Sequence, residues 1–275
     1  MILNFCSFFV TPAKAGVHAG ACATLLKIVC LALFAMAGGC VTGKHPPPDR
    51  LAEIKTVGVI SAVGDRVTFE TIGASVFGNV EVTEPIEWDI DRHVVARITA
   101  ALAGRYQVVP VNYDRVAFDK IAWADETSVA PGFRDATPRR IEDIVAAAAS
   151  PPGLDAYVVV SRATSPYARG HQIVRGLGVV RGEGSATHRP AAYAIYDLSL
   201  IDGPKHTVIA RARASLPSDG AFRLLQGPYR EIEAPIWAPS LAALAPSRQQ
   251  QLRETLLDLI DRSLPGALAG VGLIE

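Results

Sequence analysis

The sequence has no cysteine beyond residue 40. Its four cysteines all lie in the first forty of 275 residues: Cys6, Cys22, Cys30 and Cys40. A domain built from the later residues therefore contains no disulfide framework, no CxxC redox site and no thiolate metal site. Any role for cysteine belongs to the N-terminal segment.

The first forty residues, in turn, have no acidic side chain, and their only charged residues are Lys14 and Lys27. Removing these two lysines from the 27 basic residues leaves 25 against 27 acidic ones, a net charge of −2 for the rest of the chain. Such a balance gives no general attraction for nucleic acid, so no nucleic-acid partner is predicted. With 49% hydrophobic and 20% charged residues, the chain can bury a globular core without disulfide bonds or structural metal ions.

Complete catalytic and cofactor motifs are also missing. Neither GxSxG nor HExxH occurs. Gly176-Leu177-Gly178 lacks the third glycine of the dinucleotide fingerprint. The stretch from Gly38 to His45 nearly spells a P-loop, but it follows no strand and has His45 where a serine or threonine belongs. We therefore predict no cofactor, no metal and no enzymatic activity.

Two groups of residues leave catalytic alternatives open. Asp89, Asp91 and His93 form a D-x-D-x-H string that could ligate a metal, although the start of a helix explains the two acids better. Three histidines could also meet a serine and a carboxylate in the fold: His171, His188 and His206. A periplasmic hydrolase with an unrecognised site is therefore an alternative function.

A short apolar run precedes the last cysteine. From Lys27 the chain reads KIVCLALFAMAGGC, a cation followed by about ten apolar residues and then small ones. This is the plan of a secretory signal. A membrane-spanning helix needs about 20 apolar residues, so the run is too short to stay in the bilayer. A second apolar patch from Ile2 to Val10 precedes it, which indicates that translation starts downstream.

The stretch Met36-Ala37-Gly38-Gly39-Cys40 resembles the lipobox of bacterial lipoproteins, with Ala37 where that family prefers leucine. The resemblance implies that residues 1–39 are a removable signal peptide and that Cys40 is acylated as the first mature residue. Val41 stands where aspartate is associated with inner-membrane retention, so the resemblance implies an outer-membrane anchor that faces the periplasm. The alternative is ordinary signal cleavage, with Cys40 as a free thiol.

After Cys40, a polar, proline-bearing stretch over residues 40–50 predicts an extended tether, and residues 51–275 are expected to form a single globular domain. Strands are expected at 54–60, 66–72, 106–111, 156–161, 191–201 and 206–214. The first two should pair as a hairpin around Gly64 and Asp65, and so should the last two around residues 202–205.

Helices are expected from Asp89 or Asp91 to residue 104, over residues 137–149, and from Ser247 to Pro265. Ser247 and Gln250 stand in the register of a capping box. This succession predicts an α+β fold: a mixed, largely antiparallel sheet with about three helices packed mainly on one face. The order of elements is loosely similar to that of small domains in envelope assembly and secretion lipoproteins, such as the curli-secretion type.

The segment 162–189 is rich in arginine and glycine, and Glu183 is its only acid. Guanidinium groups on such a backbone could bind an anionic small molecule or polymer. The candidate ligand-binding residues are Arg162, Arg169, His171, Arg175, Arg181 and Arg189. The alternative is a solvated hairpin loop whose arginines pair with Asp155 or Asp197.

Together these patterns favour an exported lipoprotein, anchored to the membrane through Cys40, whose domain is a non-catalytic binding or assembly module with an envelope protein as its partner.

Overall fold

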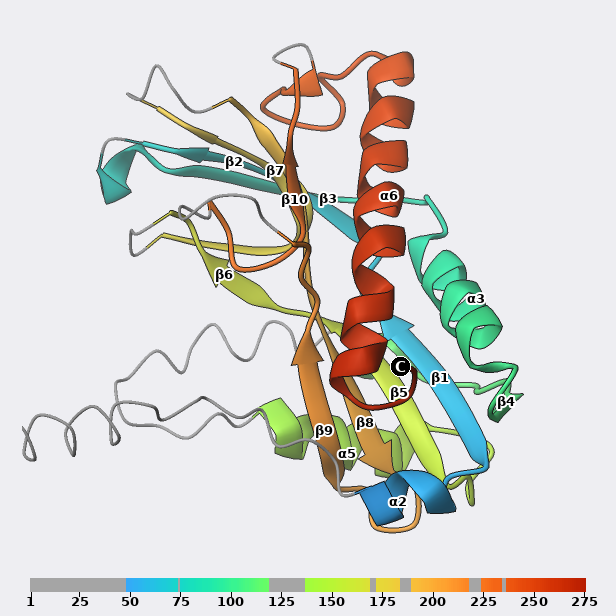
Figure 1. The fold of residues 1–275 in the computed structure, drawn as a ribbon. Coiled ribbons are helices and arrows are strands. Elements are labelled where there is room, and N and C mark those ends of the chain that lie inside the picture. The colour runs from blue at the N-terminus through green and yellow to red at the C-terminus, as the bar shows by residue number, and fades with distance from the viewer. Residues whose placement is uncertain are drawn as a thin grey trace, which may run out of the picture. The chain divides into compact units, whose positions relative to one another are not determined.

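Figure 1 shows a computed structural model of the chain, which describes residues 48–73, 75–118, 137–168, 172–183, 189–217, 224–233 and 236–275. The chain divides into two compact units, residues 1–42 and 43–275. The expected signal peptide, Cys40 and residues 41–47 of the expected tether lie outside the described residues. Residues 48–50, expected as the end of an extended tether, instead begin a helix. Among the residues described, no helix is long and apolar enough to cross a membrane.

The helices are α2 (Pro48–Glu53), η1 (Val76–Gly78), α3 (Ile90–Leu102), α5 (Thr137–Ala148) and α6 (Pro246–Gly270). The strands are β1 (Thr56–Ala62), β2 (Arg66–Ile72), β3 (Val80–Pro85), β4 (Gln107–Val109), β5 (Ala156–Arg162), β6 (Thr164–Pro166), β7 (Ile173–Gly182), β8 (Ala191–Asp202), β9 (Val208–Arg213) and β10 (Tyr229–Glu231). The α+β class is confirmed.

The sheet is organised around β8, in which all twelve residues are buried. The main path of strands is β3-β2-β7-β8-β5-β1-β4. The first part of β8, Ala191–Ile195, pairs with β7 and β10. We call this part of β8, together with β2, β3, β7 and β10, the upper block. The second part of β8, Tyr196–Asp202, pairs with β5 and β9. We call this part of β8, together with β1, β4, β5 and β9, the lower block. Figure 1 shows the two blocks one above the other along β8.

The expected hairpin between the first two strands is wrong, and the sheet is mixed rather than largely antiparallel. β1 pairs in parallel with both β4 and β5, and β2 pairs in parallel with β7. Six of the seven residues of β1 are buried, which is typical of a parallel strand that is covered on both faces. The apolar run predicted a strand correctly, but it did not reveal which strand lies beside it.

The segment 162–189, expected as a loop, contains two strands instead. β6 and β7 pair as a hairpin from Thr164↔Arg175 to Pro166↔Ile173, and β7 then continues between β2 and β8. β3 and β10 were also missed. The second hairpin, β8 with β9, is confirmed.

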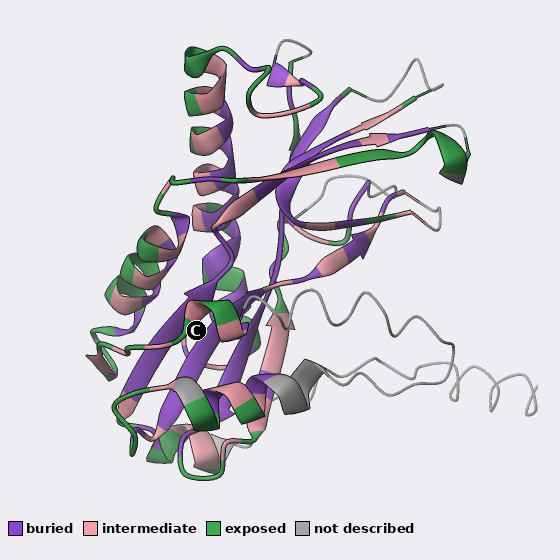
Figure 2. Ribbon diagram, turned by 180° about the vertical axis from the view of Figure 1, so that it is seen from behind, coloured by how far each residue is buried: buried purple, intermediate pink, exposed green. Residues whose placement is uncertain are grey.

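Helices cover both faces of the sheet, whereas about three helices on mainly one face were expected. α3 and α6 pack on one face in the largest apolar cluster, while Ile141 and Val145 of α5 pack on the other face against Tyr157 and Val159. Counting η1, five helices are described. Figure 2 shows that each long helix turns a buried stripe toward the sheet.

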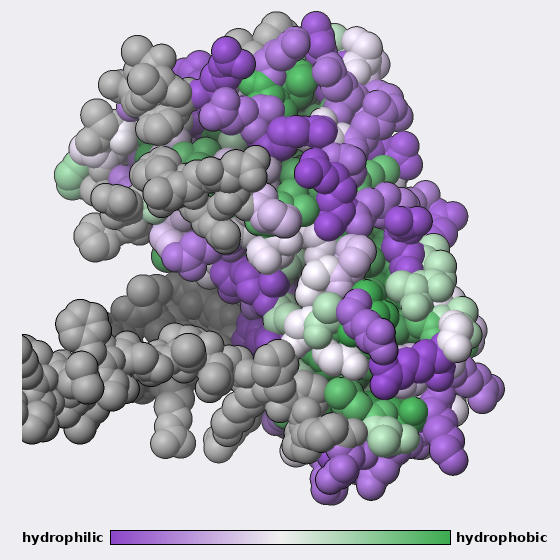
Figure 3. Space-filling model, viewed as in Figure 1, coloured by the Kyte–Doolittle hydropathy of each residue, from purple (hydrophilic) through white to green (hydrophobic). Residues whose placement is uncertain are grey.

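The predicted boundaries of the last helix are wrong at both ends. α6 begins at Pro246 after Ala245, which makes no side-chain capping bond, so the Ser247–Gln250 capping box does not form. It also continues through Pro265 to Gly270, because Ala267 and Leu268 beyond the proline are buried against the core. On the face in Figure 3, hydrophilic side chains cover most of the outer surface of α6.

Candidate functional site

A group of polar side chains lies where β1 and β5 end and α3 begins. We call Ser61, Asp65, Asp91, Arg115 and Arg162 the crossover network, because they surround the link from β1 to β2. Ligands commonly bind at the carboxyl ends of parallel strands, and β1 and β5 are parallel neighbours. This position makes the network the first candidate for a functional site.

Asp91 stands at the centre of the network. Its Oδ1 accepts hydrogen bonds from Ser61 Oγ at 2.7 Å, from the Val63 amide at 2.8 Å and from the Gly64 amide at 3.0 Å. Its Oδ2 lies 2.5 Å from Arg115 Nη2. Amide groups, a hydroxyl and a guanidinium at the N-terminal end of a helix are the donors that an external anion would use. In this fold the protein's own carboxylate occupies that position.

Arg162 closes the other side of the network. Its side chain is only 7% exposed, forms an ion pair with Asp65, and donates from Nε to the Val63 carbonyl oxygen at 3.0 Å. Burial lowers the pKa of the Arg162 guanidinium to about 10, so it stays protonated at neutral pH. Arg162 therefore fixes the β1–β2 link onto the end of β5 and is not free to bind a ligand.

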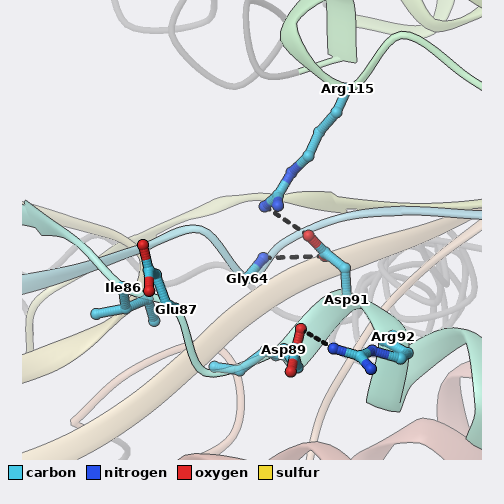
Figure 4. A pocket seen from close by; sticks show the side chains of 8 residues that line it. Gly64, Ile86, Glu87, Asp89, Asp91, Arg92 and Arg115 are labelled. Atoms are coloured by element: carbon cyan, nitrogen blue, oxygen red, sulfur yellow. Dashed lines mark hydrogen bonds and ion pairs between the residues drawn. The ribbon is translucent and has the colours of Figure 1, made fainter.

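A cavity of about 490 Å³ opens beside the network. It is lined by Gly64, Ile86, Glu87, Asp89, Ile90, Asp91, Arg92 and Arg115. Figure 4 shows Arg115 and Gly64 directed at Asp91, and Asp89 directed at Arg92. Two of the three acids that line the cavity are therefore paired with its two arginines, Asp89 with Arg92 and Asp91 with Arg115.

A second buried polar pair lies in the upper block. Tyr193 donates its hydroxyl to Glu70 Oε1 at 3.0 Å, and both side chains are buried. Burial raises the pKa of Glu70 to about 7, although the hydrogen bond from Tyr193 acts in the opposite direction. The pKa of Tyr193 is raised well above its usual value, chiefly by burial. Glu70 is thus an ionisable group in the core that titrates near neutral pH.

The arginines predicted to bind an anion do not converge in the described residues. Arg162 belongs to the crossover network, Arg175 lies 3.2 Å from Glu81 of β3, and Arg181 stacks 4.0 Å above the ring of Trp237. Arg189 is exposed ahead of β8. Arg169 and His171 lie outside the described residues. Asp155 and Asp197, the partners expected in the alternative, have other neighbours among the described residues: Asp155 accepts hydrogen bonds from Lys55 and Thr56, and Asp197 pairs with Arg211 and Arg213.

The glycines of the same segment make room for large side chains. A Cβ on Gly176 would lie 2.9 Å from Arg162 Cδ, and this glycine also has a positive φ of 59°. A Cβ on Gly178 would lie 2.5 Å from the Tyr193 hydroxyl oxygen. The glycines that suggested a flexible loop therefore allow the two buried polar groups to pack closely.

The D-x-D-x-H string does not gather a metal site. Asp89 pairs with Arg92, Asp91 points to the β1–β2 link, and His93 Nε2 lies 2.7 Å from Asp261 of α6. Within the described ranges, no three histidine, cysteine or acidic residues are grouped as metal ligands would be. Asp89 does occupy the N-cap position, but in a left-handed conformation and without a side-chain capping bond.

The histidines considered for a hydrolase are largely outside the described residues. His206 ends the turn between β8 and β9, while His171 and His188 fall in segments that the structure does not describe. Of the serines, Ser61 is bonded to Asp91 without a histidine. Sequence reasoning missed Ser61, Asp65 and Arg115 as members of one site. Arg115 follows β4, and the pairing of β4 with β1 brings it near Asp65 and Asp91.

Comparisons with known proteins give no family for this chain. No protein-family model and no curated protein matches it. A solved structure of a hypothetical protein from Chlamydia trachomatis matches at 8% identity over 78% of this chain and 94% of that chain, with a TM-score of 0.29. A likeness of this degree carries no argument about function.

Proposed function

We propose that the chain is the precursor of an exported lipoprotein, whose signal peptide of residues 1–39 is removed and whose Cys40 is acylated. The observation that carries the proposal is the apolar run that ends in Gly38-Gly39-Cys40, the last cysteine of the chain. Several acyl chains on one cysteine would anchor the domain to the outer membrane, where it would face the periplasm.

In this proposal the domain of residues 51–275 is a non-catalytic binding or assembly module for another envelope protein. The crossover network supports this role, because its carboxylates, guanidinium groups and hydroxyl are bonded to one another and hold the β1–β2 link in place. A catalytic group would need a free nucleophile or base directed at a substrate. Rigid positioning of surface elements is what a binding module requires.

Metabolic labelling with a radioactive fatty acid tests the anchor. The wild-type chain should take up the label and sediment with membranes, and Cys40→Ser should abolish both. Cys30→Ser is the matched control, since it removes a cysteine from the same segment but outside the motif, and it should be labelled like the wild type. Equal labelling of Cys40→Ser and wild type, or no labelling of either, would refute the proposal.

A further inference from the structure

The β2–β3 hairpin presents an apolar side chain at its tip. Phe77 in η1 is 96% exposed and Val80 at the start of β3 is 55% exposed. Figure 2 shows this turn as an exposed segment at the end of the hairpin. An isolated exposed apolar residue needs no explanation, but a phenylalanine this exposed, beside an exposed valine, indicates a contact surface.

The turn that presents Phe77 is held by specific interactions. The Gly78 amide donates to the Ser75 carbonyl oxygen at 3.0 Å, and the Gly73 amide donates to Asn79 Oδ1 at 3.0 Å. A Cβ on Gly73 would lie 2.7 Å from the backbone of Gly78, so the two ends of the turn are in close contact. These contacts hold the backbone on both sides of Phe77, which lowers the entropy lost when Phe77 binds.

The strand next to Phe77 has a free edge. In the described part of the chain, β3 pairs as a strand with β2 alone, and it stands at the end of the sheet order. Such an edge offers unpaired amide and carbonyl groups to an added strand. Pro85 at the far end of β3 lacks an amide hydrogen, so the edge available for pairing lies near the tip, from Val80 to Thr83.

The unpaired edge beside this tip favours a protein over the bilayer as its partner. The amide and carbonyl groups of β3 that face away from β2 can pair with another peptide backbone, whereas the hydrocarbon of a bilayer has no group that would satisfy them.

The charges near the tip also favour a protein partner over the bilayer. No lysine or arginine occurs from Val67 to Asp91, whereas Glu81, Glu84 and Glu87 do. Segments that insert into anionic membranes carry basic residues beside their apolar ones. A pocket in a protein requires no such charges.

We infer that Phe77 and the adjacent free edge of β3 form the partner-binding surface of this domain, and that the partner is an envelope protein with an apolar pocket for Phe77 and an extended segment that pairs with β3. This inference rests on the proposed function, because it names the surface that the anchored module uses. A second copy of the chain and the lipid bilayer are the competing occupants.

A photo-crosslinking residue at position 77 of the full-length protein in its native membrane tests the inference. Val116 is the matched control position, since it is also an apolar side chain, 63% exposed, on a different segment. Position 77 should yield one discrete adduct with a second protein, which position 116 does not yield. An adduct with lipid, an adduct with a second copy, or no adduct at position 77 would overturn the inference.

Affinity measurements with the captured protein, once purified, decide whether the contact matters. Phe77→Ala should weaken its binding to the full-length chain by at least about tenfold, whereas Val116→Ala should leave binding within about twofold of wild type. Equal affinities for the wild type and Phe77→Ala would overturn the inference. Fatty-acid labelling is measured on the same preparations. If the protein is labelled but gives no adduct at position 77, the binding surface is refuted and the lipid anchor is not. If the protein is not labelled, the lipid anchor itself is refuted.

Discussion

The two blocks of the sheet are covered in different ways. In the lower block, α3 and α6 pack on one face and α5 packs on the other, so β1 and β5 are apolar on both sides. In the upper block, α6 covers one face, and the cluster on the opposite face is built from strands and loops, including Tyr167, Tyr193 and Leu225. No helix contributes to that second cluster among the described residues.

This difference in cover coincides with a difference in chemistry. The lower block is filled mainly with valine, isoleucine and leucine, and its buried carboxylate in the middle of β8, Asp197, is paired with Arg211 and Arg213 of β9. The upper block buries the Glu70–Tyr193 pair within the sheet and needs Gly178 to accommodate it. Packing should therefore limit the stability of the lower block, while packing and ionisation together should limit that of the upper block.

The strongest test of the comparison is Gly178→Val in the upper block. The added Cβ would lie 2.3 Å from the Thr68 carbonyl oxygen and 2.5 Å from the Tyr193 hydroxyl oxygen. A strand backbone and a fully buried ring cannot move aside, so the free energy of unfolding should fall by more than about 3 kcal/mol, measured by urea denaturation of the full chain.

Gly104→Ala is the control for this substitution, because a Cβ there meets nothing within 4 Å. Its free energy of unfolding should stay within about 0.5 kcal/mol of wild type. A Gly178→Val protein as stable as Gly104→Ala would contradict the close packing of the upper block.

The second test removes the ionisable group of the upper block. The pKa of Glu70 is raised from 4.5 to about 7 by burial, so the folded state favours the protonated form. The stability that protonated Glu70 contributes to the folded state is fully present below about pH 4.5 and is lost as the pH rises through about 7. At 1.36 kcal/mol per pKa unit, the wild type should lose about 2 to 3 kcal/mol relative to Glu70→Gln between pH 5 and pH 8.

Urea denaturation of both proteins at several pH values measures this difference, and comparison with Glu70→Gln cancels the other titrating groups. Glu81 across the strand pair, Arg175 and Tyr193 also act on Glu70, and all three are kept. If the free energy of unfolding changed with pH equally in the two proteins, ionisation of Glu70 would not destabilise the folded state, and the prediction would be wrong.

The third test addresses the junction of the two blocks. Asp91→Ala leaves Arg115 without its closest carboxylate and removes the acceptor of the Ser61, Val63 and Gly64 hydrogen bonds. Unpaired buried donors should lower the free energy of unfolding by about 2 kcal/mol. Asp143→Ala, on the exposed side of α5, should change it by less than about 0.5 kcal/mol. Equal effects of the two substitutions in urea denaturation would show that the network is dispensable.

Sequence patterns predicted the lower block better than the upper block. The apolar runs of β1 and β5 and the helical spacing of α3 and α5 gave the right elements, because burial on a helix or strand leaves a periodic trace in the chain. β7 was missed because Gly176 and Gly178 interrupt its apolar pattern, and a strand rich in glycine is indistinguishable from a loop without knowledge of Tyr193 and Arg162.

The candidate site was harder to predict than the elements. Ser61, Asp91 and Arg162 lie on three elements that are far apart in the sequence. The parallel pairing of β1 with β5 and the packing of α3 on β1 bring them together. Phe77 carries no periodic signal at all. Its importance as a candidate depends on its exposure, which is a property of the folded chain.

The smallest expected effect concerns α6, the element that the two blocks share. Gly266 is exposed within the helix, and a Cβ there meets nothing within 4 Å, so Gly266→Ala should raise the free energy of unfolding by about 0.5 to 1 kcal/mol. Gly270→Ala is the matched contrast, because its Cβ would lie 2.8 Å from Ala212 Cβ of β9, and it should destabilise the protein.

Since α6 belongs to one apolar cluster with buried residues of both blocks, the gain from Gly266→Ala should slow amide hydrogen exchange in β2 and β7 as well as in β5 and β9. Slower exchange in the lower block alone would mean that the upper block opens independently, with α6 still packed on the strands below it.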